Sequence, residues 1–161
     1  MKYTLSVLVE NHFGVLSKVA GLFSRRGFNI ESLSVGETED AGISRMTIVV
    51  DGDDYTLEQI EKQLNKVIPV IKVRVLPEGT YIERELTLIK VSCTNQQRPD
   101  IMKVAELMGA RIVDVGSNCM SLEFTDTRRR TGVLLSLLKP YGIRELVRTG
   151  LTAIEKSSKQ S

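Results

Sequence analysis

The chain has 161 residues, of which 42% are hydrophobic and 26% charged, a composition typical of a folded globular protein. Its 22 basic and 20 acidic side chains nearly cancel, so the net charge of +2 gives no reason to expect nucleic acid or a membrane surface as a partner. The apolar runs are far shorter than the roughly 20 residues of a membrane-spanning helix. A strand expected close to Met1 leaves no room for a signal peptide, so we expect a cytoplasmic protein.

The first 76 residues predict the order strand, helix, strand, strand, helix, strand. Apolar residues alternate over Leu5–Val9 and then recur at helical spacing from Val15 to Phe23, and Gly27 is a typical helix stop. The remaining expected elements are strands over 28–35, 45–50 and 70–76 and a helix over 57–67.

The same order recurs after a predicted linker at 77–83, which opens with Pro77-Glu78-Gly79-Thr80. In the second module, residues 84–154, we expect strands over 86–93, 111–115, 120–124 and 143–148 and helices around 101–108 and 133–138, followed by a polar tail at 155–161. The predicted fold class is therefore α+β, with two tandem ferredoxin-like βαββαβ modules. Because each half is small and would leave sheet edges unpaired, we also expect a homodimer.

The loop after the first strand is the best candidate for a binding site. It contains Asn11 and Gly14 and runs directly into the first helix at Val15 and Leu16. A helix N-terminus offers free N–H groups and partial positive charge to a small anion, and glycine allows close approach to the backbone. Asn29 and Ile30, at the start of the next strand, could reach the same loop of a second subunit.

Other conspicuous residues have simpler interpretations. His12 lacks an evident catalytic partner, and Cys93 and Cys119 lie among apolar neighbours and match no metal-binding spacing. We therefore expect two buried free thiols, no catalytic residues and no metal site. The run Arg128-Arg129-Arg130 is expected on the solvated first turn of a helix, with contact to a protein partner or an anion as the alternative.

Three segments together resemble a known family. They are LSVLVEN at 5–11, GVLSKV at 14–19 and GLFSRRGFNIESL at 21–33, supported by SRMTI at 44–48, EQIEKQLNK at 58–66 and EREL at 83–86. This pattern is similar to ACT domains, and more narrowly to the small regulatory subunit of acetohydroxyacid synthase, also called acetolactate synthase. The similarity is dense over residues 1–90 and weaker beyond.

The resemblance implies a noncatalytic regulator of branched-chain amino-acid biosynthesis. Such a subunit would activate a separate large catalytic subunit, which would carry thiamine diphosphate, Mg²⁺ and FAD, and would confer feedback inhibition by valine or another branched-chain amino acid. This chain would itself hold no cofactor. By position, the valine site would comprise Asn11, Gly14, Val15 and Leu16 of one chain with Asn29 and Ile30 of its dimer mate.

Two other classes remain as alternatives. One is an ACT-type amino-acid sensor for a different biosynthetic enzyme. The other is an RNA-recognition module, which shares the βαββαβ order but stacks bases on aromatic residues of its central strands. The segments Leu5–Val9 and Arg45–Val50 contain no aromatic residue, which disfavours the RNA interpretation.

Overall fold

The computed structural model describes residues 1–158 and divides them into two compact units. Unit 1 contains Met1–Ile82 together with the segment from Leu151 onward, and unit 2 contains Glu83–Gly150. Each unit has its own buried core, so each is described separately.

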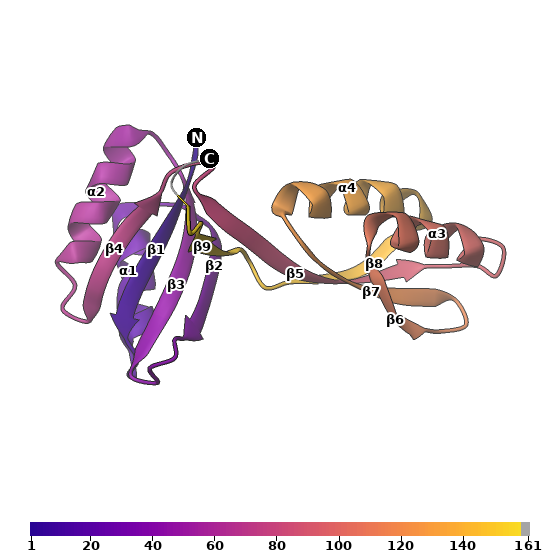
Figure 1. Cartoon of the computed structure of the whole chain (residues 1–161), viewed down its shortest axis with the longest axis horizontal. Helices are drawn as coiled ribbons and strands as arrows, with labels where there is room; N and C mark the ends of the chain where they lie inside the picture. Colours follow the sequence, from indigo (N-terminus) through magenta and orange to yellow (C-terminus); the bar gives the residue numbers. More distant parts are fainter. Residues whose placement is uncertain (159–161) are drawn as a thin grey trace. The chain divides into compact units, whose positions relative to one another are not determined.

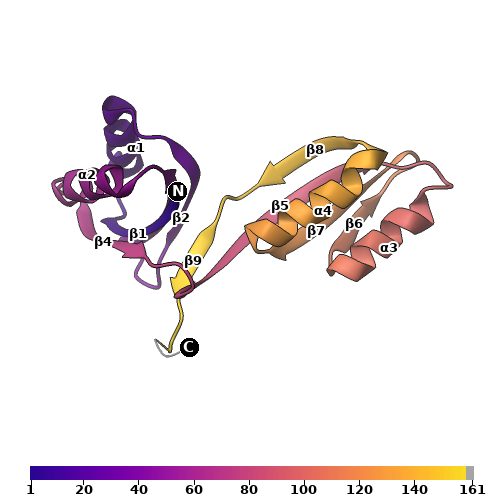
Figure 2. The ribbon, with the colours of Figure 1, turned by 90° about the horizontal axis from the view of Figure 1, so that it is seen from above.

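Unit 1 contains the first βαββαβ module. Its elements are β1 (Lys2–Glu10), α1 (Val15–Arg26), β2 (Ile30–Glu37), β3 (Ile43–Asp51), α2 (Asp54–Asn65) and β4 (Val70–Leu76). The strands form an antiparallel sheet in the order β2-β3-β1-β4, and both helices cover the same face of it (Figures 1 and 2). The ferredoxin-like arrangement expected from the sequence is confirmed.

Local sequence explains where the helices of unit 1 begin and end. Gly27 caps the C-terminus of α1 in the left-handed region, at φ 70°, which confirms the predicted stop. The Asp53 carboxylate caps α2 by accepting a hydrogen bond from the Thr56 N–H at 2.8 Å. The alternation in β1 places Leu5, Val7 and Val9 in the core, each at most 1% exposed.

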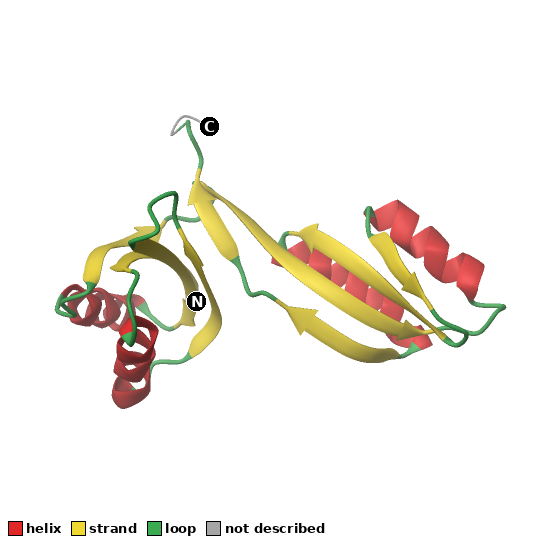
Figure 3. Cartoon of the chain, turned by 90° about the horizontal axis from the view of Figure 1, so that it is seen from below, coloured by secondary structure: helices red, strands yellow, loops and turns green. Residues whose placement is uncertain are grey.

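Unit 2 repeats the arrangement. Its elements are β5 (Tyr81–Ser92, which begins two residues inside unit 1), α3 (Arg98–Met108), β6 (Arg111–Val115), β7 (Cys119–Asp126), α4 (Arg128–Leu138), a short 3₁₀ turn η1 (Lys139–Tyr141) and β8 (Ile143–Arg148). The sheet order is β6-β7-β5-β8, and α3 and α4 lie on one face of it (Figure 3). The strand expected over 86–93 thus begins five residues earlier, so the ordered turn between β4 and β5 is shorter than the predicted linker at 77–83.

The segment from Leu151 differs from the sequence-based expectation. The sequence predicts that the second module runs to residue 154, whereas residues from Leu151 onward group with unit 1, where β9 (Thr152–Glu155) pairs with β5. The Leu151 N–H donates to Ser32 Oγ at 2.8 Å, and Ser34 Oγ donates to the Leu151 carbonyl at 2.8 Å. This segment therefore covers hydroxyl-bearing residues of β2. Of the predicted tail, Glu155 lies in β9 and residues 159–161 lie outside the described part.

Candidate ligand-binding site

The loop between β1 and α1 is fastened to the β2–β3 turn. The Asn11 side-chain amide donates to the Ala41 carbonyl at 2.8 Å and to the Glu37 carboxylate at 3.3 Å. The Asn11 backbone N–H donates to the Gly42 carbonyl at 2.8 Å. Because its amide hydrogens are used inside the chain, the side chain of Asn11 can offer a ligand its carbonyl oxygen.

Gly14 ends this loop and is the N-cap of α1. Its φ of 88° lies in the left-handed region that favours glycine, and a Cβ added there would meet no other atom within 4 Å. The first turn that follows, from Val15 to Lys18, contains no acidic residue. The positive end of the helix dipole therefore meets open space over Gly14, which is the geometry of an anion site.

The two predicted apolar residues of the helix play different parts. Val15 is 3% exposed and anchors the first turn in the core, whereas Leu16 is 46% exposed. The neighbouring Phe13 is fully exposed. Phe13 is not one of the predicted site residues, and together with Leu16 it leaves two exposed apolar side chains next to the candidate site.

Asn29 and Ile30 lie at the other end of α1. Asn29 is exposed and Ile30 is half-buried against the core, at the start of edge strand β2. Phe28 fixes this end by packing edge-on against Phe23, with ring centroids 6.2 Å apart. The 12 residues of α1 separate the two ends by about 18 Å at about 1.5 Å per residue. Within one chain, the six predicted residues therefore form two groups rather than one pocket.

Other residues considered in the sequence are His12, Cys93 and Cys119. His12 Nε2 lies 3.0 Å from the Glu10 carboxylate, and both side chains are about half exposed. Cys93 and Cys119 are free thiols; Cys93 is buried as expected, whereas Cys119 is only partly buried. Across residues 1–158, no group of three or more His, Cys, Asp or Glu side chains is placed to hold a metal ion. None of the helices in this described part is long and apolar enough to cross a membrane.

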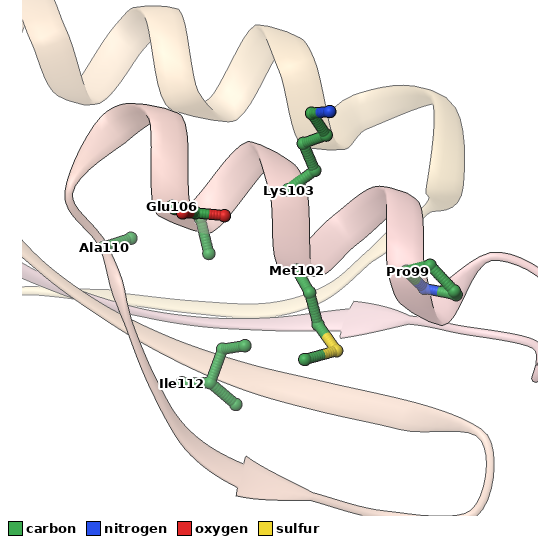
Figure 4. Close-up of a pocket in the computed structure, with 7 residues that line it drawn as sticks. Pro99, Met102, Lys103, Glu106, Ala110 and Ile112 are labelled. Carbon is green, nitrogen blue, oxygen red and sulfur yellow. The ribbon is translucent and has the colours of Figure 1, made fainter.

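A concave surface lies in unit 2, between α3 and edge strand β6. The groove has a volume of about 520 Å³, and Met102 of α3 extends towards Ile112 of β6 across it (Figure 4). It is also lined by Pro99, Lys103, Ala105, Glu106 and Ala110. The lining is mainly apolar, and none of the six predicted site residues belongs to it.

Sequence reasoning missed Glu85, a fully buried acidic residue of unit 2. It alternates with Thr87, Ile89 and Val91, all of which are buried on the same face of β5. The available signal was its position in that apolar alternation, since an acidic residue on an inward face is uncommon.

Comparison with known proteins covers both units. Residues 5–72 match the family model described as an acetohydroxyacid synthase small subunit-like ACT domain, and residues 84–157 match that of the small subunit of acetolactate synthase. The chain is 49% identical over 160 residues to a probable acetolactate synthase small subunit of Archaeoglobus fulgidus, covering 99% of this chain and 100% of that protein.

Further relatives agree with these matches. The acetolactate synthase small subunit of Mycolicibacterium smegmatis is 49% identical over 154 residues, covering 96% of this chain and 91% of that protein. The crystal structure of the acetolactate synthase small subunit from Thermotoga maritima superposes with a TM-score of 0.91 at 39% identity, covering 98% of this chain and 99% of that one. The chain therefore belongs to the acetolactate synthase small-subunit family, as the sequence pattern indicates.

Proposed function

We propose that this chain is a noncatalytic regulatory subunit that activates a separate acetolactate synthase catalytic subunit and makes it sensitive to valine. The observation that carries the proposal is the uncompensated N-terminus of α1 above Gly14, beside a loop held in place by Asn11. Thiamine diphosphate, Mg²⁺ and FAD belong to the catalytic partner in this proposal.

The valine site forms when two copies of the chain pair along their β2 edges. Asn11 bonds to Glu37, so the loop carrying Gly14 lies near the C-terminal end of β2, whereas Asn29 precedes its N-terminal end. In an antiparallel pairing about a two-fold axis, opposite ends of the two β2 strands meet. Asn29 and Ile30 of one copy then approach Gly14 of the other, which joins the two groups that one chain keeps apart.

Valine suits the chemistry of this combined site. Its carboxylate accepts hydrogen bonds from N–H groups of the first turn of α1 other than that of Val15, which donates to the His12 carbonyl. Its ammonium donates to the Asn11 carbonyl oxygen. Its isopropyl group lies against the exposed part of Leu16 and against Ile30 of the second copy. Valine then shifts the equilibrium between subunit arrangements by binding one of them more tightly, which lowers the activity of the catalytic partner.

The alternative within the same fold is an amino-acid sensor for another biosynthetic enzyme. It has the same site but a different partner, so binding alone does not separate the two. An RNA-binding role is disfavoured by the sheet itself, because the segment from Leu151 bonds to Ser32 and Ser34 of β2. RNA-recognition modules need an open sheet face with stacked aromatic residues.

The test combines binding with reconstitution. Calorimetric titration of the purified chain with valine, leucine and isoleucine should show saturable valine binding near one site per chain. Mixing the chain with the large subunit should raise acetolactate formation, and valine should reverse that increase. Binding of valine without any effect on the large subunit would favour the other-enzyme alternative, and the absence of both effects would refute the proposal.

A further inference from the structure

Unit 2 contains a buried glutamate, Glu85, whose carboxylate charge is only partly compensated by its neighbours. The Glu85 side chain is 0% exposed, and neither of its carboxylate oxygens has a hydrogen-bond partner among the described residues. Its ion-pair partners are two guanidiniums, with Arg128 Nε at 3.8 Å from one oxygen and Arg148 Nε at 3.9 Å from the other. A buried carboxylate without hydrogen bonds is costly, so a purely structural role explains it poorly.

The two arginines come from different elements, and both lie next to Glu85. Arg128 is the first residue of α4, and Arg148 is the last residue of β8, where it pairs with Thr87 of β5. Their side chains are 34% and 32% exposed. Each guanidinium has five N–H donors, and the Nε atom is the one facing Glu85. One buried carboxylate therefore holds two cations that still reach the surface.

Positive charge is in excess around this pair. The neighbouring stretches of β5, β7, α4 and β8 contribute the carboxylates of Glu83, Glu85 and Asp126 and the guanidiniums of Arg84, Arg128, Arg129, Arg130 and Arg148. Asp126 is already paired with Arg130 at 2.8 Å. Three arginines at the start of α4 also oppose the helix dipole, and such a departure from local stability is typical of a functional surface.

We propose that Glu85 is a positioning residue that presents Arg128 and Arg148 as a docking site for a carboxylate in an acidic segment of the catalytic large subunit. This inference rests on the proposed function, which supplies the partner. A carboxylate is the matching group because guanidiniums bind it with paired, charge-assisted hydrogen bonds. An acidic side chain bound at this surface accepts hydrogen bonds from the N–H groups of both arginines that do not face Glu85, and it balances the excess positive charge.

The experiment measures the concentration of this chain that gives half-maximal activation of the large subunit. Arg128→Gln and Arg148→Gln should each raise it by about tenfold or more and reduce its dependence on salt. Lys139→Gln, at the other end of α4, is the matched control for loss of one positive charge and should leave it nearly unchanged. Valine binding by the isolated chain should stay the same in all three variants.

Glu85→Gln separates positioning from general attraction. It removes one buried negative charge and so makes the net charge of this region more positive by one, and simple electrostatic attraction to an acidic partner would therefore strengthen activation. The positioning role predicts the opposite, because the two arginines lose the group that holds them. If this variant does not fold, Arg128→Lys replaces it. Lysine keeps the charge but lacks the planar donor pair, so this variant should activate the large subunit better than Arg128→Gln but less well than wild type.

The outcomes distinguish this inference from the function on which it rests. Failure of the wild-type chain to activate the large subunit would remove the proposed function itself. Normal activation by wild type with no difference between the arginine variants and Lys139→Gln would overturn the docking site alone. Inorganic phosphate is the probe for a free anion. If phosphate bound wild type but not Arg148→Gln, and did not compete with the large subunit, the arginine pair would be a free-anion site and the inference would be overturned.

Discussion

Gly14→Asp should abolish valine sensitivity while leaving the fold intact. The new side chain has room, because a Cβ at Gly14 would meet no atom within 4 Å. The φ of 88° makes a side chain there cost about 1–2 kcal/mol of stability, and a carboxylate at a helix N-terminus returns about 0.3–1 kcal/mol. The net loss should therefore be about 1 kcal/mol, which a folded domain tolerates.

The effect on the ligand should be much larger. Two carboxylates about 4 Å apart repel each other by about 4 kcal/mol at an effective dielectric constant of about 20. At about 1.4 kcal/mol for each tenfold change, the dissociation constant for valine should rise by a factor of about 10³. Activation of the large subunit should persist, because the docking site proposed in unit 2 is unchanged.

Calorimetry on three variants tests this reasoning. Gly109→Ala is the matched control, because Gly109 caps α3 in unit 2, outside the proposed site, with φ 79° and equally open space around it. Gly14→Ala adds the same backbone strain at the site without the charge. If Gly14→Asp bound valine within about threefold of wild type, or if Gly109→Ala weakened binding equally, the proposed site would be wrong.

Three further predictions concern stability, each measured by urea unfolding. Leu134→Ala, at a fully buried position of α4, should cost unit 2 about 2–5 kcal/mol, and a cost below 1 kcal/mol would mean that α4 packs differently. Ser32→Ala removes the acceptor of the Leu151 N–H and should cost about 1–3 kcal/mol, with faster hydrogen exchange at the Leu151 amide. Burial opposes ionisation of Asp126, but hydrogen bonds from the Thr127 N–H and the Arg130 guanidinium hold its pKa below the usual value. Its stabilisation is therefore present above about pH 4 and is lost as the pH falls through the lowered pKa. The destabilisation caused by Asp126→Asn should accordingly shrink from about pH 6 to about pH 3, and a constant difference would contradict this account.

Local patterns predicted most of the fold. β4, β6 and β8 have the bounds expected from alternating or continuous apolar residues, and α1 stops where Gly27 predicts. These features depend on neighbours in the chain, so the sequence contains their cause. The strand over Thr152–Glu155 was not predicted, because it depends on a partner strand and on serine hydroxyls more than a hundred residues away.

The candidate site shows the same division. The sequence indicated Gly14 and the helix start that follows, since both are local features. It could not predict that the Asn11 amide is used by Ala41 and Glu37, because that contact joins two separate loops. Glu85 was missed for a related reason, since its arginine partners come from distant elements.

The chain reaches its last part of unit 1 only after unit 2 has been made, which has a consequence for synthesis on the ribosome. Unit 2 interrupts unit 1 between Ile82 and Leu151, and the Lys156 N–H returns to bond with the Thr80 carbonyl at 2.9 Å. At about 5–20 residues per second, the ribosome adds the intervening 68 residues (83 to 150 inclusive) in about 3 to 14 seconds. During that interval the hydroxyls of Ser32 and Ser34 lack the Leu151 backbone groups to which they bond in the complete chain. A nascent chain stalled before Leu151 should therefore expose β2 to chaperones and proteases, and its release should mark the moment when unit 1 becomes resistant.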